Sequence, residues 1–214
     1  MIRLVDIIFS MFGMIMLFPL FIVVSVLVKK DHGPAFYFQE RVGKDGRSFR
    51  IIKFRSMIVN AEKLGAKITA GKDPRITEVG HFLRKTKIDE LPQLINVFLG
   101  NMSIVGPRPE VPKYVAKWPM KDKKKILSVK PGITDYASLL YSNEQELLAD
   151  SETPEKLYLK EIMPRKLELY IKYVEERSFW LNFRIIIATI FKIFGLNLSL
   201  LLPEIRLKSR RLIG

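Results

Sequence analysis

The stretch IIFSMFGMIMLFPLFIVVSVLV, residues 7–28, decides how this chain is organised, because its 22 residues include no charged side chain. As a straight helix, a segment of this length reaches about 30 Å, the thickness of a bilayer's hydrocarbon core. A cleaved signal peptide is disfavoured, since the run is longer than the apolar region of such peptides and no small-residue cleavage site precedes Lys29. The sequence therefore predicts a membrane-embedded N-terminal segment.

Pro19, near the middle of this segment, leaves two topologies open. Proline removes a backbone donor and clashes with the preceding turn, so a break would leave two halves of about 10–12 residues, each too short to cross. Charged residues lie on both flanks, which is compatible with a hairpin whose ends share one interface. A bent spanning helix is also compatible, because membrane helices tolerate proline. In both cases the basic remainder belongs on the cytoplasmic side.

The composition describes a folded, strongly basic protein. The 214 residues carry 36 Lys and Arg against 22 Asp and Glu, a net charge of +14, and 48% of them are hydrophobic. This balance predicts one well-cored domain with a polyanionic partner such as anionic lipid, nucleic acid or a phosphorylated substrate. With no cysteine and two histidines, a disulfide scaffold, a thiol nucleophile and a His-rich zinc site are not expected. Any metal should be a hard cation held by oxygens.

Beyond the apolar segment, the patterns predict a mainly helical α+β domain. Aromatic and β-branched residues at 36–38 and 49–54 flank the turn sequence GKDG at 43–46, as expected for a small β-hairpin. A proline-rich stretch over 107–132, interrupted by the basic run Lys121–Lys125, is expected to be mostly loop. Helical patterns occur at 59–67, 79–84, 89–99, 144–149 and 154–176.

The C-terminal region is apolar over residues 179–202 but carries Arg184 and Lys192. An amphipathic helix at the membrane interface fits this pattern better than a second span or a core helix. The basic tail that follows suits anionic headgroups, and a solvated end explains it equally well. We therefore divide the chain into a re-entrant membrane hairpin (1–30), a catalytic domain (31–178), an interfacial helix (179–204) and a basic tail (205–214).

The most suggestive polar cluster is RKTKIDELPQ, residues 84–93, in which two adjacent carboxylates follow three cations. Proline is acceptable in a first helical turn, so a helix is expected to start near Asp89, which can cap it; a start capped by Thr86 is the alternative. Both place Asp89 at the positive end of a helix dipole, where carboxylates and phosphates are stabilised. For an isolated pair, a capping Asp89 beside a solvated Glu90 is the simpler interpretation.

Two rigid turns carry further cations. Prolines on both sides restrict the backbone of Arg108 in GPRP, which limits the entropy lost when its guanidinium binds a phosphate. Lys130 stands at the start of a similar turn, KPGIT. Taken singly, each is adequately explained as a turn with an exposed cation.

Several long motifs in one order are far more specific than any of these pieces. They are GPAFYFQERVG at 33–43, KFRSM at 53–57, FLRKTKIDELPQ at 82–93, NVFLGNMSIVGPRP at 96–109 and KPGIT at 130–134. Together with the N-terminal apolar segment, they resemble the bacterial sugar transferases known as monotopic phosphoglycosyl transferases. The resemblance covers most of the chain.

The resemblance implies a function. Such enzymes join a phospho-sugar from a UDP-sugar to polyprenol (undecaprenyl) phosphate and release UMP, at the cytoplasmic face of the bacterial inner membrane. This step initiates cell-surface glycans such as capsule, exopolysaccharide and O-antigen. It also implies the re-entrant hairpin and a covalent mechanism, in which Asp89 attacks the phosphorus that bears the sugar.

The resemblance also assigns roles to residues. A carboxylate is ionised near neutrality and needs no base, but a diphosphate repels it, so Mg²⁺ and cations must neutralise that anion. Glu90 is the implied Mg²⁺ ligand and Arg108 the best candidate for a phosphate anchor. Weaker candidates for a basic substrate-binding pocket are Arg41, Lys53, Arg55, Arg84 and Lys130.

Three residues depart from the family pattern. Phe18 precedes Pro19 where serine is frequent, and Asn101 and Asn182 replace common aspartates. Asparagine keeps capping ability but loses charge, so neither is expected to bind metal. After KPGIT the sequence reads DYAS rather than the family's frequent GWAQ, so the sugar cannot be inferred from relatives.

Two other functions deserve comparison with the transferase. The altered asparagines would suit a non-catalytic membrane-surface scaffold derived from the family, but the intact Asp89–Glu90 pair and Arg108 argue against it. Net charge alone suggests a nucleic-acid binder, yet no helix-turn-helix, zinc or RNA-recognition signature is present, so nucleic acid is not an expected partner.

Overall fold

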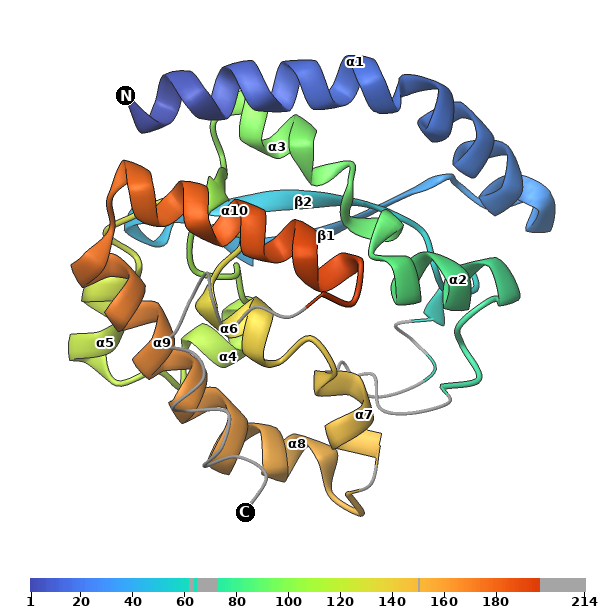
Figure 1. Cartoon of the computed structure of the whole chain (residues 1–214). Helices are drawn as coiled ribbons and strands as arrows, with labels where there is room; N and C mark the ends of the chain where they lie inside the picture. Colours follow the sequence, from blue (N-terminus) through green and yellow to red (C-terminus); the bar gives the residue numbers. More distant parts are fainter. Residues whose placement is uncertain (62–63, 65–72, 150, 197–214) are drawn as a thin grey trace.

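The computed structural model describes residues 1–61, 64, 73–149 and 151–196. A long N-terminal helix, α1 (Ile2–Val28), crosses the top of the molecule in Figure 1, and the rest of the chain packs below it. Most of the predicted helix at 59–67, residues 197–204 of the predicted interfacial helix, and the basic tail at 205–214 lie outside the described residues.

α1 continues through Pro19 as one helix that bends (Figure 1), and the expected break into two helices is not seen. Proline removes only one backbone donor, and a bend is enough to relieve its clash with the preceding turn. Within the described part of the chain, α1 is the one helix long and apolar enough to cross a membrane by length and composition. Its topology in the bilayer stays a prediction.

Both ends of α1 are fastened to the same folded domain. Near its start, Arg3 donates hydrogen bonds to the backbone oxygens of Val97 (2.6 Å) and Phe98 (2.8 Å), and the Asp6 carboxylate accepts from Ser103 Oγ (2.9 Å) and from the Ile104 amide (3.0 Å).

At the other end of α1, Val24 and Val28 pack in a cluster with Phe54 and Leu83. The Val28 carbonyl also accepts a hydrogen bond from Arg55 Nη2 at 2.9 Å. After a short 3-10 turn, η1 (Lys29–Asp31), the chain enters the domain. The helix therefore lies along the domain rather than projecting from it.

The predicted hairpin is confirmed. β1 (Phe36–Val42) pairs antiparallel with β2 (Ser48–Phe54), with Phe36 opposite Phe54, and the turn η2 (Lys44–Gly46) joins them. Asp45 and Gly46 both have positive φ (57° and 77°), which the Asp-Gly sequence accommodates.

The region around the two adjacent carboxylates is more divided than expected. α2 (Glu78–Thr86) confirms the helix predicted at 79–84, but residues 89–99 form a 3-10 turn, η4 (Ile88–Glu90), followed by a short helix, α3 (Gln93–Leu99). Lys87, in the left-handed conformation (φ 59°), separates α2 from η4. Thr86 does not cap a helix, because its hydroxyl donates to the Phe82 carbonyl within α2. Gly100, also left-handed (φ 89°), ends α3.

The proline-rich middle is less irregular than the sequence suggests. It contains two short helices, α4 (Pro112–Val115) and α5 (Met120–Ile126), so the basic run at 121–125 is helical. Two three-residue strands, β3 (Ser103–Val105) and β4 (Gly132–Thr134), pair in parallel. Gly106 and Gly132 permit this pairing, since a Cβ on Gly132 would lie 2.0 Å from the Gly106 amide nitrogen. The GPRP and KPGIT motifs are thus in backbone contact.

The C-terminal half supplies the main core. The helices predicted at 144–149 and 154–176 are confirmed, and the second runs without a break through a π-helical turn at 158–162. The most buried side chains of this core include Tyr136, Tyr170, Tyr173 and Ile185. The elements are α6 (Tyr136–Leu140), α7 (Glu144–Ala149), α8 (Pro154–Leu157), the turn η5 (Tyr158–Ile162), α9 (Met163–Glu176) and α10 (Phe179–Ile193).

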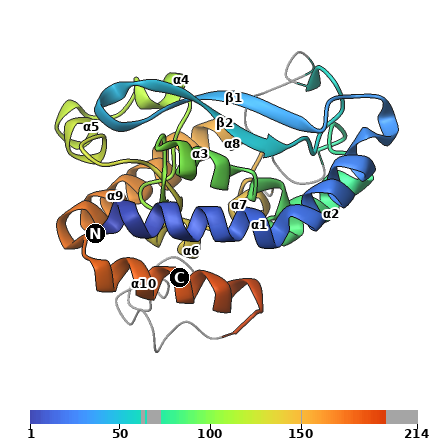
Figure 2. The ribbon, with the colours of Figure 1, turned by 90° about the horizontal axis from the view of Figure 1, so that it is seen from above.

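Two helices leave large apolar side chains uncovered. On α10, Leu181, Ile185 and Ala188 face the core, whereas Trp180 is 70% exposed. Seen from above in Figure 2, α10 and α1 run in roughly the same direction along one side of the molecule. On α1, the exposed side chains include Leu4, Phe12, Ile15, Met16, Phe18 and Val26.

Candidate active site

Asp89 is held in the turn η4, where the chain passes from α2 to α3. Its side chain is buried (7% exposed), and its Oδ1 has no hydrogen-bond partner among the described residues. Burial, and then the neighbouring Glu90, raise the pKa of Asp89, while Lys53, Arg84 and Lys87 act in the opposite direction. Asp89 is therefore an unpaired carboxylate surrounded by positive charge.

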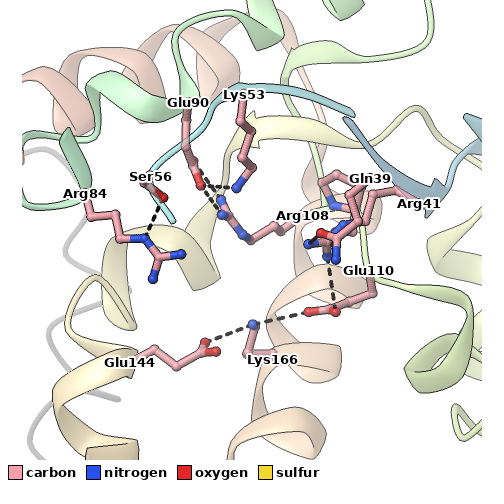
Figure 3. Close-up of polar contacts among 11 residues, drawn as sticks. Gln39, Arg41, Lys53, Ser56, Arg84, Glu90, Arg108, Glu110, Glu144 and Lys166 are labelled. Atoms are coloured by element: carbon pink, nitrogen blue, oxygen red, sulfur yellow. Dashed lines mark hydrogen bonds and ion pairs between the residues drawn. The ribbon is translucent and has the colours of Figure 1, made fainter. Parts of the chain in front are cut away.

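Glu90 has the opposite environment. Its Oε1 accepts from Lys53 Nζ at 2.7 Å, and both of its oxygens accept from the guanidinium of Arg108 (Figure 3), with 3.1 Å between Nη1 and Oε2. Burial disfavours ionisation of Glu90, but the charges of Arg108 and Lys53 outweigh it, and its pKa lies well below the ordinary value. Glu90 is thus a fixed anion that positions two cations.

Two more cations approach Asp89 from the α2 side. Arg84, near the end of α2, donates from Nε to Ser56 Oγ at 2.8 Å, and its Nη1 is buried without a partner among the described residues. Lys87 follows on the left-handed residue before η4. Both lower the pKa of Asp89, and Arg84 has unused hydrogen-bonding capacity for an anion.

Glu110, Glu144 and Lys166 lie below Glu90 and Arg108 in Figure 3. Together with Arg41 and Tyr158, which contact Glu110, they form a second polar group of the same cavity, which we call the lower cluster. Lys166 Nζ lies 2.9 Å from Glu144 Oε2 and 3.6 Å from Glu110 Oε1. Tyr158 donates to Glu110 at 2.8 Å, and Arg41 Nη1 lies 3.7 Å from Glu110. Two cations and two carboxylates balance in this cluster.

Both groups line one cavity of about 820 Å³, which is large enough for a nucleotide sugar. β1 and β2 contribute Arg41 and Lys53, η4 contributes Asp89 and Glu90, and the loop after β3 contributes Arg108. The cavity therefore combines a cationic end around Asp89 with an electrically balanced end at the lower cluster.

The structure brings together most of the residues predicted for the site. Asp89, Glu90, Arg108, Lys53, Arg84 and Arg41 all line the cavity. Arg41 faces the lower cluster, with its Nη1 donating to the Pro109 carbonyl at 3.0 Å and its Nη2 donating to Gln39 at 2.5 Å.

Arg55 and Lys130 have different surroundings. Arg55 also borders the cavity, but its guanidinium donates to the backbone oxygens of Pro34 (2.7 Å), Met57 (3.0 Å) and Val28 (2.9 Å), which indicates a structural role. Lys130 does not line this cavity. It lies near the start of α1, where burial and the charge of Arg3 lower its pKa.

The three departures from the family pattern also lie outside the cavity wall. Phe18 is 62% exposed on α1, and Asn101 is exposed just after α3. Asn182 is buried, and its Oδ1 accepts from the Tyr173 hydroxyl at 3.0 Å, so it serves the core. None of the three borders Asp89.

The carboxylates permit a weakly held cation. Among the described residues, no three His, Cys, Asp or Glu side chains come together in a way that could hold a metal ion by themselves. Mg²⁺, however, is commonly bound by one or two carboxylates together with substrate phosphates. Asp89 Oδ1 is free for this, whereas both Glu90 oxygens are already engaged by Arg108 and Lys53. The pair fits a cation that a diphosphate would help to hold.

Comparison with known proteins decides the family. The sequence model of the family described as "Bacterial sugar transferase" matches residues 1–195. The chain belongs to this family. The resemblance seen in the motifs is therefore confirmed, as is the prediction that this is a transferase.

Individual relatives of this transferase carry related names. A protein of Bacillus subtilis, whose assignment as an undecaprenyl-phosphate N-acetylgalactosaminyl 1-phosphate transferase is provisional, is 44% identical over 70% of this chain and 78% of its own length. The UDP-glucose:undecaprenyl-phosphate glucose-1-phosphate transferase of Escherichia coli is 35% identical over 88% of this chain. The undecaprenyl-phosphate galactose phosphotransferase of Salmonella typhimurium is 41% identical over 62% of this chain. The matched regions cover 39% and 31% of these last two proteins.

Sequence reasoning missed part of the transferase cavity. Glu110 directly follows the GPRP motif, so its proximity to Arg108 was a usable signal. Glu144 and Lys166 belong to helices of mixed charge, where nothing in the sequence marks a lysine that is only 4% exposed. Their position depends on how α7 and α9 pack, which local sequence does not specify.

Proposed function

We propose that this chain transfers a sugar 1-phosphate from a UDP-sugar to undecaprenyl phosphate and releases UMP, as the first step of a cell-surface glycan. The observation that carries the proposal is the buried, unpaired Asp89 carboxylate at the cationic end of a cavity of nucleotide-sugar size. The names of the relatives support the donor and acceptor classes.

Transfer proceeds in two displacements at one phosphorus. An Asp89 oxygen attacks the phosphorus that bears the sugar; the bond from that phosphorus to the bridging oxygen breaks, and UMP leaves with the electron pair. The product is an acyl phosphate that links Asp89 to the sugar phosphate. An oxygen of undecaprenyl phosphate then attacks the same phosphorus, and the acyl–phosphate bond breaks, which regenerates the Asp89 carboxylate.

The cations of the site solve the electrostatic problem in this reaction. A carboxylate and a diphosphate repel one another, and preorganised positive charge lowers the cost of bringing them together. Arg84 and Arg108 are placed to bind phosphate oxygens, and Glu90 holds Arg108 and Lys53 in position. Mg²⁺ bound chiefly by the diphosphate, with this carboxylate pair beside it, would neutralise further charge on the diphosphate and leave an Asp89 oxygen free to attack.

The attachment of α1 supports a re-entrant topology. Arg3 and Asp6 at its start, and Val28 at its end, all contact the same domain, whereas a spanning helix would place its two ends on opposite sides of the bilayer. The exposed outer face of α1 then lies in lipid, and the domain lies on the cytoplasmic surface, where its basic residues meet anionic lipids. An acceptor with its tail in lipid could present its phosphate at this depth.

The scaffold alternative receives no support from the site. Its motivation was the replacement of two family aspartates by Asn101 and Asn182, and neither residue lines the cavity. Catalysis requires the cationic groups around Asp89, whereas a scaffold has no need of them.

The deciding experiment is the Asp89→Asn variant, assayed for UMP release from UDP-sugars with undecaprenyl phosphate and Mg²⁺. Turnover should fall by at least about a thousandfold, because the nucleophile is lost, while the melting temperature is retained. Asp122→Asn, on α5 and outside the cavity, is the matched control and should be fully active. Trapping of labelled phospho-sugar on the wild-type protein before acceptor is added tests the covalent step. Full activity of Asp89→Asn would refute the nucleophile.

A further inference from the structure

We infer that Glu144, positioned by Lys166, binds hydroxyl groups of the donor's sugar and sets which UDP-sugar this enzyme uses. The inference rests on the proposed function and specifies the part of the donor that the lower cluster recognises. Its first support is the division of charge within the cavity. The diphosphate belongs at the cationic end, among Lys53, Arg84 and Arg108, because the cations there outnumber the carboxylates Asp89 and Glu90, whereas the charges of the lower cluster balance. An uncharged part of the donor must then occupy the balanced end.

The chemistry of the lower cluster favours a sugar ring. Carboxylates accept hydrogen bonds from hydroxyl groups, and such charge-assisted bonds are stronger than neutral ones. Of the two Glu144 oxygens, Oε2 is engaged by Lys166, and Oε1 has no partner within the part of the chain that the structure describes. The Glu144 side chain is 27% exposed, so a ligand in the cavity can reach it.

The distance from the reacting group favours the sugar over the nucleoside. The sugar is attached to the phosphorus that Asp89 attacks, whereas the nucleoside lies one phosphate further away. In Figure 3, Glu144 and Lys166 lie below Glu90 and Arg108, and all four residues line the same cavity. The pKa of Arg108 is raised chiefly by Glu90 and, less strongly, by Tyr170 and Glu144, so the charge of Glu144 also acts on this cation.

Lys166 acts through Glu144 rather than on the ligand. It is only 4% exposed, and its ammonium group lies between Glu144 Oε2 (2.9 Å) and Glu110 Oε1 (3.6 Å). Glu110 is itself fixed by the Tyr158 hydroxyl at 2.8 Å. This series of contacts, from Tyr158 through Glu110 to Lys166, therefore holds the Glu144 carboxylate at the cavity wall. Lys166 is a positioning residue.

The test compares donor preference in wild type, Glu144→Gln and Glu144→Asp. The kcat/KM for UMP release is measured with UDP-glucose, UDP-galactose, UDP-N-acetylglucosamine and UDP-N-acetylgalactosamine. Glutamine keeps the shape of the Glu144 side chain but loses its charge. Aspartate keeps the charge but, being one methylene shorter, moves it away from the ligand. Each variant should change the ratio between the best donor and at least one other by about tenfold, while the inhibition constant of UMP changes less than twofold. Lys166→Arg, which keeps the charge, should shift the ratios less than Glu144→Gln.

The control is Glu175→Gln, which removes a carboxylate from another ion pair, with Lys125, on the surface of α9. It should leave every donor ratio unchanged. The inference would be overturned if both Glu144 variants lost kcat/KM equally with all four donors, or if UMP inhibition weakened by the same factor as the donor ratios change. The transferase function would stand in either case. If wild-type protein released UMP from none of the four donors, the proposed function itself would fall.

Discussion

At the scale of single residues, the site depends on two neighbouring carboxylates that the fold treats differently. Glu90 faces Lys53 and Arg108, and its pKa is depressed; Asp89 points away from direct ion pairs, and its pKa is raised. A nucleophile whose oxygen is already bound to a cation is less reactive, so the unpaired residue suits attack and the paired one suits positioning. The 3-10 turn produces this division, because it directs adjacent side chains to different surroundings.

The pKa of Asp89 leads to a prediction for Lys87→Gln. Lys87 lowers this pKa, so its removal should raise the pKa further. In the proposed mechanism, attack requires the ionised Asp89 carboxylate, which is present above the pKa and is lost as the pH falls through it. The acid limb of kcat/KM should therefore move to higher pH, by roughly a few tenths of a pH unit.

Lys85→Gln is the matched control for this measurement. Lys85 is an exposed cation of the same α2–η4 region that is not among the causes of the Asp89 shift, and its removal should leave the acid limb in place. An unchanged limb in Lys87→Gln, or a limb that moves to lower pH, would contradict the electrostatic account of Asp89.

Residues that the sequence marked as a candidate site come together at one end of the cavity, and they could be found because they lie in contiguous motifs. Asp89, Glu90 and Arg108 each stand in a turn with recognisable residue types. The same reasoning assigned Arg55 and Lys130 to substrate, and it could not tell a cation that binds phosphate from one that binds backbone carbonyls. That difference depends on what packs opposite each side chain, which only the fold determines.

At the scale of elements, Arg55 lies directly after β2 and links the end of α1 to the segments that precede β1 and follow β2. Its three hydrogen bonds to carbonyl oxygens are buried or partly buried. In Arg55→Lys a single ammonium group cannot reach all three, so about 2–4 kcal/mol of unfolding free energy should be lost. Thermal unfolding in detergent measures the loss, with Arg50→Lys at an exposed site of β2 as control. Equal melting temperatures of the two variants would contradict a structural role for Arg55.

The exposed face of α10 leads to a prediction that uses the two tryptophans of the chain. Trp180, on α10, is 70% exposed, whereas Trp118 is 6% exposed in the core. If α10 lies in the membrane interface, brominated acyl chains in nanodiscs should quench Trp180 strongly and Trp118 weakly. The Trp118→Phe variant reports on Trp180, and Trp180→Phe reports on Trp118. Weak quenching of Trp180 would exclude α10 from the lipid.

The elements show where prediction from sequence succeeds and why it stops. The β1–β2 hairpin and the helices α2, α7 and α9 follow from local periodicity and turn residues, and they were predicted. The β3–β4 pair was not, since each strand has only three residues and their pairing depends on the close approach of Gly106 and Gly132. Pro19 predicted a break in α1, but α1 is a single bent helix whose two halves both contact the domain.

At the scale of the whole molecule, the re-entrant arrangement can be tested by cysteine labelling, because the chain contains no native cysteine. One variant carries a cysteine inserted after Met1, a second carries Lys30→Cys beyond the other end of α1, and the control Lys121→Cys marks the domain. The fastening of both helix ends to one domain predicts that all three sites lie on the same side. A membrane-impermeant maleimide should therefore label none of them in intact spheroplasts and all of them after permeabilisation. Labelling of one flank of α1 without the other in intact spheroplasts would show that the helix spans the bilayer, and the contacts of Arg3, Asp6 and Val28 could then not exist together in the membrane.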